Sequence, residues 1–157
     1  MTRQVAVCGP AECGEQDRAV AHRVGELLAA AGVVTLCGGG TGVMAAVTAA
    51  ARSGGGLVVA VRPDTGRAPE ASVTLSTNLG QARNAVLVES ADAVIVVGGS
   101  WGTLSELALA MRRGVPVVSL GGWRMLDRTG APVPGVHHVE TPEEAVALAA
   151  SGASRRT

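Results

Sequence analysis

A stretch near the middle of the chain, residues 93–106, decides the fold: Ala93-Val94-Ile95-Val96-Val97-Gly98-Gly99-Ser100-Trp101-Gly102-Thr103-Leu104-Ser105-Glu106. Its first five residues are continuously apolar and rich in β-branched side chains, which is typical of a strand covered on both faces. Glycines follow at once, and then Leu104, Leu107, Ala108 and Met111 recur at helical spacing. The stretch therefore predicts a strand, a tight glycine turn and a helix, the repeating unit of a parallel α/β sheet.

The same unit recurs along the chain. Similar apolar runs predict strands at 5–8, 33–37, 57–61, 115–120 and 135–139. Between and after them, helical patterns occupy 15–31, 43–52, 82–90 and 143–150, whereas 62–80 and 121–135 look irregular. We therefore expect a doubly wound, Rossmann-like parallel sheet in a single α/β domain covering residues 1–150, followed by a flexible tail at 151–157.

Two glycine-rich loops follow predicted strands and lead into helices, at residues 38–42 and 98–103. Glycine lets the backbone approach a ligand closely, and the free N–H groups of a helix start favour an anion. The loops therefore predict a phosphate or nucleotide site, with these binding residues: Gly39, Gly40, Thr41, Gly99, Ser100, Trp101, Gly102 and Thr103. The alternative is that the glycines only make the tight turns that any α/β protein needs.

Composition excludes several functions. The chain has 157 residues and no net charge, its 13 basic residues are all arginine, and it contains neither Phe nor Tyr. Without lysine it cannot form the Schiff base of a pyridoxal-phosphate enzyme or use a Walker A lysine. The balanced charge and scarce aromatic rings argue against a nucleic-acid partner. No apolar stretch reaches the length of a membrane span, and three cysteines supply no zinc quartet, so we expect a cytoplasmic protein with no metal site.

Residues 98–106 resemble the GGxGTxxE signature of the LOG ("lonely guy") family, in the GGxxGTxxE spacing of its short, SLOG-type bacterial relatives. Residues 37–44 resemble that family's earlier glycine loop, and Arg83 matches an arginine ahead of the signature. The resemblance implies a Rossmann-like fold, a homodimer or higher oligomer, and a small-molecule ligand. Characterised members are phosphoribohydrolases that split a nucleoside 5′-monophosphate into free base and ribose 5-phosphate, and other relatives bind nucleotides or carry molybdenum cofactor. Members are often mislabelled lysine decarboxylases, an activity that the absence of lysine excludes here.

Carried over by position, the resemblance makes Arg83 and Glu106 the catalytic pair, with the Gly99, Gly102 and Thr103 amides on the 5′-phosphate. A carboxylate could stabilise the oxocarbenium character of the ribose or orient water, and an arginine could hold the phosphate. The chain departs from the hydrolases, however. It has Val97 for a proline, one extra loop residue, and Asn84 for the lysine that follows the arginine.

Two functions therefore stay open. One is a phosphoribohydrolase of the LOG type, and the other is a non-catalytic protein that binds or carries a nucleotide or molybdenum cofactor in the same pocket. No cofactor is required for the hydrolysis; a nucleotide, a phosphate or molybdenum cofactor could be bound. Glu106 could also serve only in a capping box with Thr103, and Trp101 could be an interface anchor instead of a lid over a base.

Overall fold

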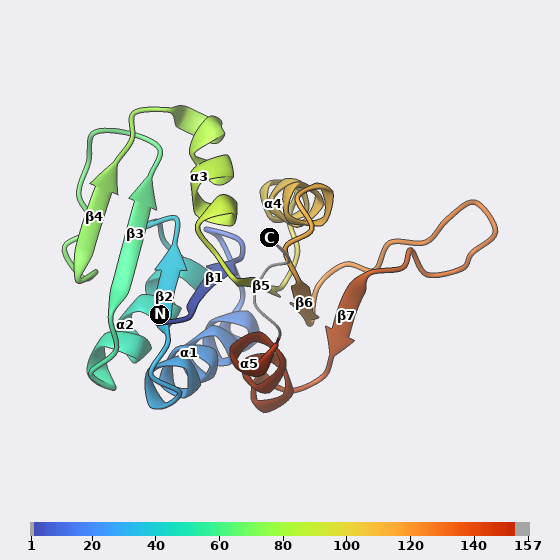
Figure 1. Cartoon of the computed structure of the whole chain (residues 1–157), viewed down its shortest axis with the longest axis horizontal. Coiled ribbons are helices and arrows are strands. Elements are labelled where there is room, and N and C mark those ends of the chain that lie inside the picture. Colours follow the sequence, from blue (N-terminus) through green and yellow to red (C-terminus); the bar gives the residue numbers. More distant parts are fainter. Residues whose placement is uncertain (1, 153–157) are drawn as a thin grey trace.

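The strand predicted at residues 93–97 lies in the middle of a seven-stranded parallel sheet in the computed structural model, which describes residues 2–152 (Figure 1). The strands are β1 (Gln4–Cys8), β2 (Val34–Cys37), β3 (Val58–Arg62), β4 (Val73–Ser76), β5 (Ala93–Val97), β6 (Val117–Leu120) and β7 (Val136–Val139). Their order across the sheet is β4-β3-β2-β1-β5-β6-β7. The chain winds outward from β1 to one edge, returns to β5 beside β1, and winds outward to the other edge.

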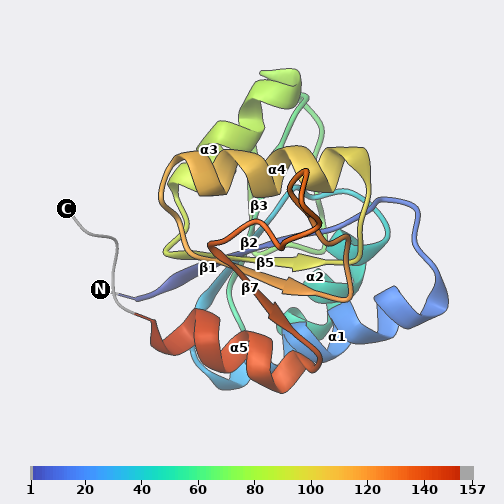
Figure 2. The same cartoon turned by 90° about the vertical axis from the view of Figure 1, so that its right-hand side faces the viewer.

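Helices cover both faces of this sheet. They are α1 (Glu15–Ala30), α2 (Val43–Ser53), α3 (Arg83–Glu89), α4 (Trp101–Arg112) and α5 (Pro142–Ser151), with a 3-10 turn, η1 (Gly80–Ala82), ahead of α3. Figures 1 and 2 show α1, α2 and α5 on one face and α3 and α4 on the other. Each face has its own apolar core, one around Val24, Leu28 and Val47 and the other around Leu87 and Leu107. The structure confirms the doubly wound, Rossmann-like single domain.

Several helix ends follow the predicted local chemistry. The first turn of α1 contains Glu15 and Asp17, which complement the helix dipole, and Gly32 follows its end with a positive φ of 67°. At α5, Thr141 accepts a hydrogen bond from the Glu144 amide and Pro142 occupies the first turn, as predicted. The end of α5 at Ser151 takes in the first residue of the expected tail, and residues 153–157 lie outside the described part of the chain.

One strand was not predicted. The segment 62–80, expected to be irregular, contains β4, which pairs in parallel with β3 at the edge of the sheet. The side chains of Val73 and Leu75 on this strand stay exposed. An edge strand of four residues with no buried apolar run gives little sequence signal, because the pattern that predicts a strand comes from burial.

The segment between β6 and β7 is irregular, as expected, apart from an isolated bridge between Leu126 and Pro132. Figure 1 shows it extending away from the sheet. No helix within residues 2–152 has both the length and the apolar character that crossing a membrane requires.

Candidate functional site

A cleft of about 220 Å³ opens where the carboxyl ends of β1 and β5 meet. Its walls are residues 9–11 after β1, Met44 of α2, the start of α3 and the first turns of α4. The winding of the sheet reverses between β1 and β5, and ligands of open parallel sheets bind at such a switch.

Arg83 and Glu106, the pair that the resemblance singles out, both line this cleft. Arg83 begins α3 and Glu106 lies on the second turn of α4, so two helices of the same layer bring the charges together. Arg83 Nη1 lies 3.6 Å from Glu106 Oε1, and only 12% and 10% of the two side chains is exposed. This contact is an ion pair without hydrogen-bond geometry. Within residues 2–152, Arg83 Nε and Nη1 are buried without any hydrogen-bond partner.

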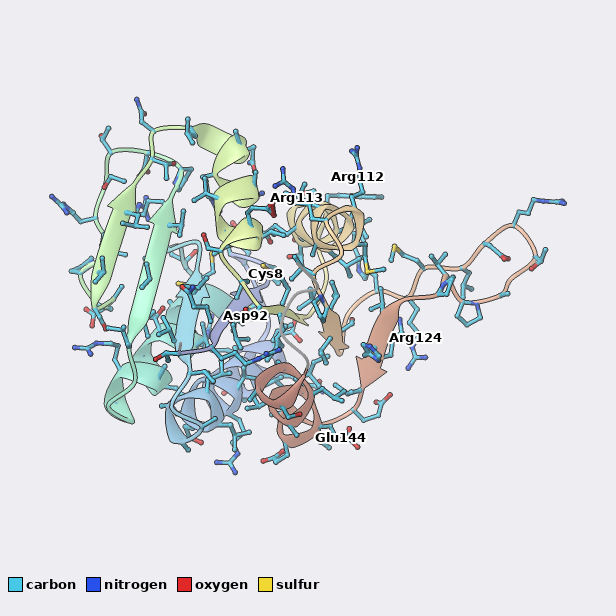
Figure 3. All side chains as sticks on the ribbon, viewed as in Figure 1. Cys8, Asp92, Arg112, Arg113, Arg124 and Glu144 are labelled. Atoms are coloured by element: carbon cyan, nitrogen blue, oxygen red, sulfur yellow. The ribbon has the colours of Figure 1, made fainter. Side chains whose placement is uncertain are left out.

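The Glu106 carboxyl group is buried deeply enough to change its acidity. Burial raises its pKa above the usual range, while the Arg83 guanidinium and a hydrogen bond from the Cys8 thiol act in the opposite direction. Cys8 ends β1 beneath the cleft, and burial raises the pKa of its thiol well above the ordinary value. Figure 3 places Cys8 at the centre of the molecule, between the helix layers. A thiol so placed is a neutral donor to Glu106, not a nucleophile.

Ser100 is the N-cap of α4, and its position shows that Glu106 takes no part in capping this helix. Ser100 Oγ accepts a hydrogen bond of 3.1 Å from the Thr103 amide, so α4 begins at Trp101. The alternative in which Thr103 and Glu106 form a capping box is therefore wrong, because Glu106 lies beyond the third helical position and faces Arg83. Ser100, Gly102 and Thr103 line the cleft near this helix start.

Most of the first glycine loop, residues 38–42, does not line this cleft. Gly39, Gly40 and Thr41 line a separate cavity of about 200 Å³ with Arg62 and residues 67–70. Gly38 alone lies under the Arg83 side chain: a Cβ placed there would come within 2.6 Å of Arg83 Nη1. The Met44 side chain borders the cleft and lies against Gly40, so it separates the two spaces.

Gly99 and Trp101 also lie apart from Arg83. Gly99 is covered by Trp123, since a Cβ on Gly99 would lie 2.6 Å from the Trp123 ring. The ring centroids of Trp101 and Trp123 are 5.0 Å apart, with an interplanar angle of 79°. Trp101 is 79% exposed and sits in the first turn of α4. The predicted residues that the structure brings together are thus Arg83, Glu106, Ser100, Gly102 and Thr103.

Sequence reasoning missed other parts of the cleft. Residues 9–11 form one wall because they follow β1, the strand beside the switch. Asn84 and Gln81 form another wall, and Asn84 is only 7% exposed. The available signal for Asn84 is its departure from the hydrolase pattern, in which a lysine occupies this position.

Comparison with known proteins places this geometry in a family. The family model described as the SLOG cluster4 family matches residues 2–146. The chain belongs to the SLOG cluster4 family. An uncharacterised protein of Archaeoglobus fulgidus is 43% identical over 145 residues, which is 91% of each chain.

Solved structures resemble this SLOG cluster4 protein over most of its length. The molybdenum cofactor binding protein from Rippkaea orientalis is 29% identical with a TM-score of 0.83, and the match covers 94% of this chain and 95% of that one. The molybdenum cofactor carrier protein from Chlamydomonas reinhardtii is 27% identical with a TM-score of 0.81, covering 94% and 96%. The SLOG-type resemblance inferred from residues 98–106 is thereby confirmed.

Proposed function

We propose that this SLOG cluster4 protein binds a phosphorylated small molecule, a nucleotide or molybdenum cofactor, in the β1–β5 cleft and releases it unchanged. The observation that carries the proposal is the Arg83 side chain, whose Nε and Nη1 are buried without hydrogen-bond partners within residues 2–152. Unpaired buried donors cost free energy, and a guanidinium suits phosphate oxygens because it offers several N–H groups in one plane. A phosphate in the cleft would remove that cost.

The start of α4 supports the same anion site. The first amides of a helix have no partner within the helix, and here only the Thr103 amide is used by the Ser100 cap. The helix dipole adds a partial positive charge. Ser100, Gly102 and Thr103 at this end line the cleft that also contains Arg83. A guanidinium and a helix start facing one cleft give two independent attractions for a phosphate group.

The cleft suits the organic part of molybdenum cofactor. Arg83 could hold its phosphate, and Asn84 Oδ1, a buried acceptor without a partner in the described chain, could hold an N–H of its heterocycle. Within residues 2–152 no three His, Cys, Asp or Glu side chains gather as metal ligands. The bound cofactor would supply redox chemistry to an acceptor enzyme, and here the protein's residues would only hold and shield it.

Hydrolysis of a nucleoside 5′-monophosphate is the second candidate function. It is favoured by the Glu106 carboxyl group, which lines the cleft close to Arg83. A carboxylate there could orient water at the ribose. Carriage has the stronger support, because two solved structures that match 94% of this chain, at 29% and 27% identity, are described as molybdenum cofactor proteins.

One experiment separates the two functions. Purified protein is titrated with sulfate, AMP and GMP by calorimetry, and the same nucleotides are incubated with it and analysed for free base by chromatography. We expect binding of both nucleotides and no release of base. Release of base that disappears in Glu106→Gln would establish the hydrolase instead, and no binding of any anion would contradict both functions.

Glu106→Gln is expected to bind AMP about tenfold more tightly than the wild type at neutral pH, because it removes a negative charge next to the anion site and frees Arg83. A raised carboxyl pKa means that Glu106 becomes neutral as the pH falls toward that pKa, which lies above 4.5. The two affinities should therefore converge with falling pH. Calorimetric titrations at several pH values measure their ratio, in which the ionisation of AMP itself cancels.

Glu15→Gln is the matched control, since it removes the same charge from an exposed position in the first turn of α1. Its AMP affinity should follow the wild type at every pH. A ratio for Glu106→Gln that stays constant with pH would contradict the electrostatic role of Glu106.

We further propose a homodimer or higher oligomer, a small-molecule ligand in place of nucleic acid, and a cytoplasmic location. The oligomer is supported by exposed apolar side chains such as Leu79 and Val86 near α3. Light scattering coupled to size-exclusion chromatography tests the oligomeric state. Gel-shift titration with single- and double-stranded DNA tests whether the protein binds nucleic acid.

A further inference from the structure

Asn84 is a buried polar side chain that the phosphate site leaves unexplained. It is the second residue of α3, follows Arg83 directly, and is 7% exposed. Its Nδ2 donates to Gln81 Oε1 at 3.5 Å, which orients the amide. Its Oδ1 is buried and accepts no hydrogen bond from any residue in 2–152.

The cleft therefore offers two opposite kinds of group side by side. Arg83 presents unpaired donors, and Asn84 presents an unpaired acceptor from the next residue. Both side chains line the same cleft, together with Gln81 and Glu106. An anion such as sulfate can satisfy the arginine but has no hydrogen to give to Asn84 Oδ1. A buried acceptor left unpaired in a complex penalises the ligand that fails to pair it.

We propose that Asn84 selects ligands that carry a hydrogen-bond donor, an N–H or O–H group, within reach of their phosphate binding position. This inference rests on the proposed binding function, and it names the class of ligand: phosphate esters of a compound bearing an amino, ring N–H or hydroxyl donor. Such a donor can come from a heterocycle or from a sugar. Asn84 occupies the position where the related hydrolases have a lysine. Where that lysine would contact the ligand through its charge, Asn84 would accept a hydrogen bond from the ligand.

Matched ligand pairs test the selection and separate the two sources of the donor. GMP and IMP differ by an exocyclic amino group, AMP and purine riboside monophosphate by another, and AMP and 2′-deoxy-AMP by a hydroxyl. For at least one pair, we expect the wild type to bind the donor-bearing member about tenfold more tightly, equivalent to about 1.4 kcal/mol. The pair that shows the difference identifies the source.

Three variants test whether Asn84 causes this ratio of affinities between the two members of a ligand pair. Asn84→Leu has similar size and no acceptor, so its ratio should fall to about one. Asn84→Asp keeps an acceptor and should keep the preference, although its added negative charge should lower the affinity for both ligands of a pair. Asn78→Asp, at the exposed asparagine ahead of η1, is the control and should leave the ratio unchanged.

A stability measurement guards against a folding effect. Since Asn84→Leu removes a buried unpaired acceptor, its melting temperature should equal or exceed that of the wild type. Three results would overturn the inference: no preference within any pair, a preference that Asn84→Leu retains, or a preference for members that lack the donor. If sulfate and all nucleotides fail to bind, the proposed function fails first and the inference fails with it.

Discussion

Arg83→Gln should lower the affinity for AMP and for sulfate about 100-fold. The guanidinium is the buried cation of the cleft, and its Nε and Nη1 have no hydrogen-bond partner within residues 2–152, so an anion gains both charge and hydrogen bonds there. Hydrogen bonds to a charged group contribute about 1.5–3 kcal/mol, and a loss of about 2.7 kcal/mol is a factor of 100. Isothermal titration calorimetry measures the change.

Arg112→Gln is the control for this variant. Arg112 lies at the opposite end of α4 from the cleft, and Figure 3 shows it pointing away from the molecule. Removing Arg83 alone also leaves the buried Glu106 without its ion-pair partner, which destabilises the fold. The double variant Arg83→Gln/Glu106→Gln should recover part of this stability. Wild-type anion affinity in folded Arg83→Gln would contradict the assigned site.

Gly42→Ala is expected to destabilise the protein by about 3 kcal/mol. Gly42 precedes α2 with a φ of 62° and a ψ of −124°, a backbone conformation outside the left-handed helical region that costs a residue with a side chain about 1–3 kcal/mol. A Cβ there would also lie 2.4 Å from the carbonyl oxygens of Pro10 and Ala11, and such overpacking costs about 1–3 kcal/mol more. Urea denaturation measures the loss.

Gly32→Ala is the comparison variant. Gly32 also has a positive φ, 67°, but a Cβ there meets no atom within 4 Å. It should lose only the conformational part, about 1–2 kcal/mol. Because Pro10 and Ala11 form a wall of the cleft, Gly42→Ala should in addition weaken AMP binding, whereas Gly32→Ala should not. Equal losses of stability in the two variants would mean that the close backbone contact is relieved at no cost.

The fold was predictable because its central strands are buried on both faces. Runs such as 93–97 have no polar residue to interrupt them, and the glycines that follow mark where each strand ends. The edge strand β4 was missed for the opposite reason: Val73 and Leu75 remain exposed, so its sequence has no pattern imposed by burial.

The candidate site was only partly predictable. The contact of Arg83 with Glu106 followed from the resemblance, and the structure brings these side chains together across α3 and α4. The division of the glycine loops between two cavities was not foreseen, because it depends on the Met44 side chain lying against Gly40. Asn84 could not be assigned a role from sequence, because its missing partner is visible only in three dimensions.

The edge-to-face pair of Trp101 and Trp123 gives the start of α4 an optical probe of its own. The chain has two tryptophans and no tyrosine, so its near-ultraviolet emission comes entirely from these indoles. Their rings lie 5.0 Å apart, with Trp101 following Ser100, the cap of α4 that lines the cleft. Any movement of the α4 start on ligand binding would change the emission of both rings, without a dye or a tag.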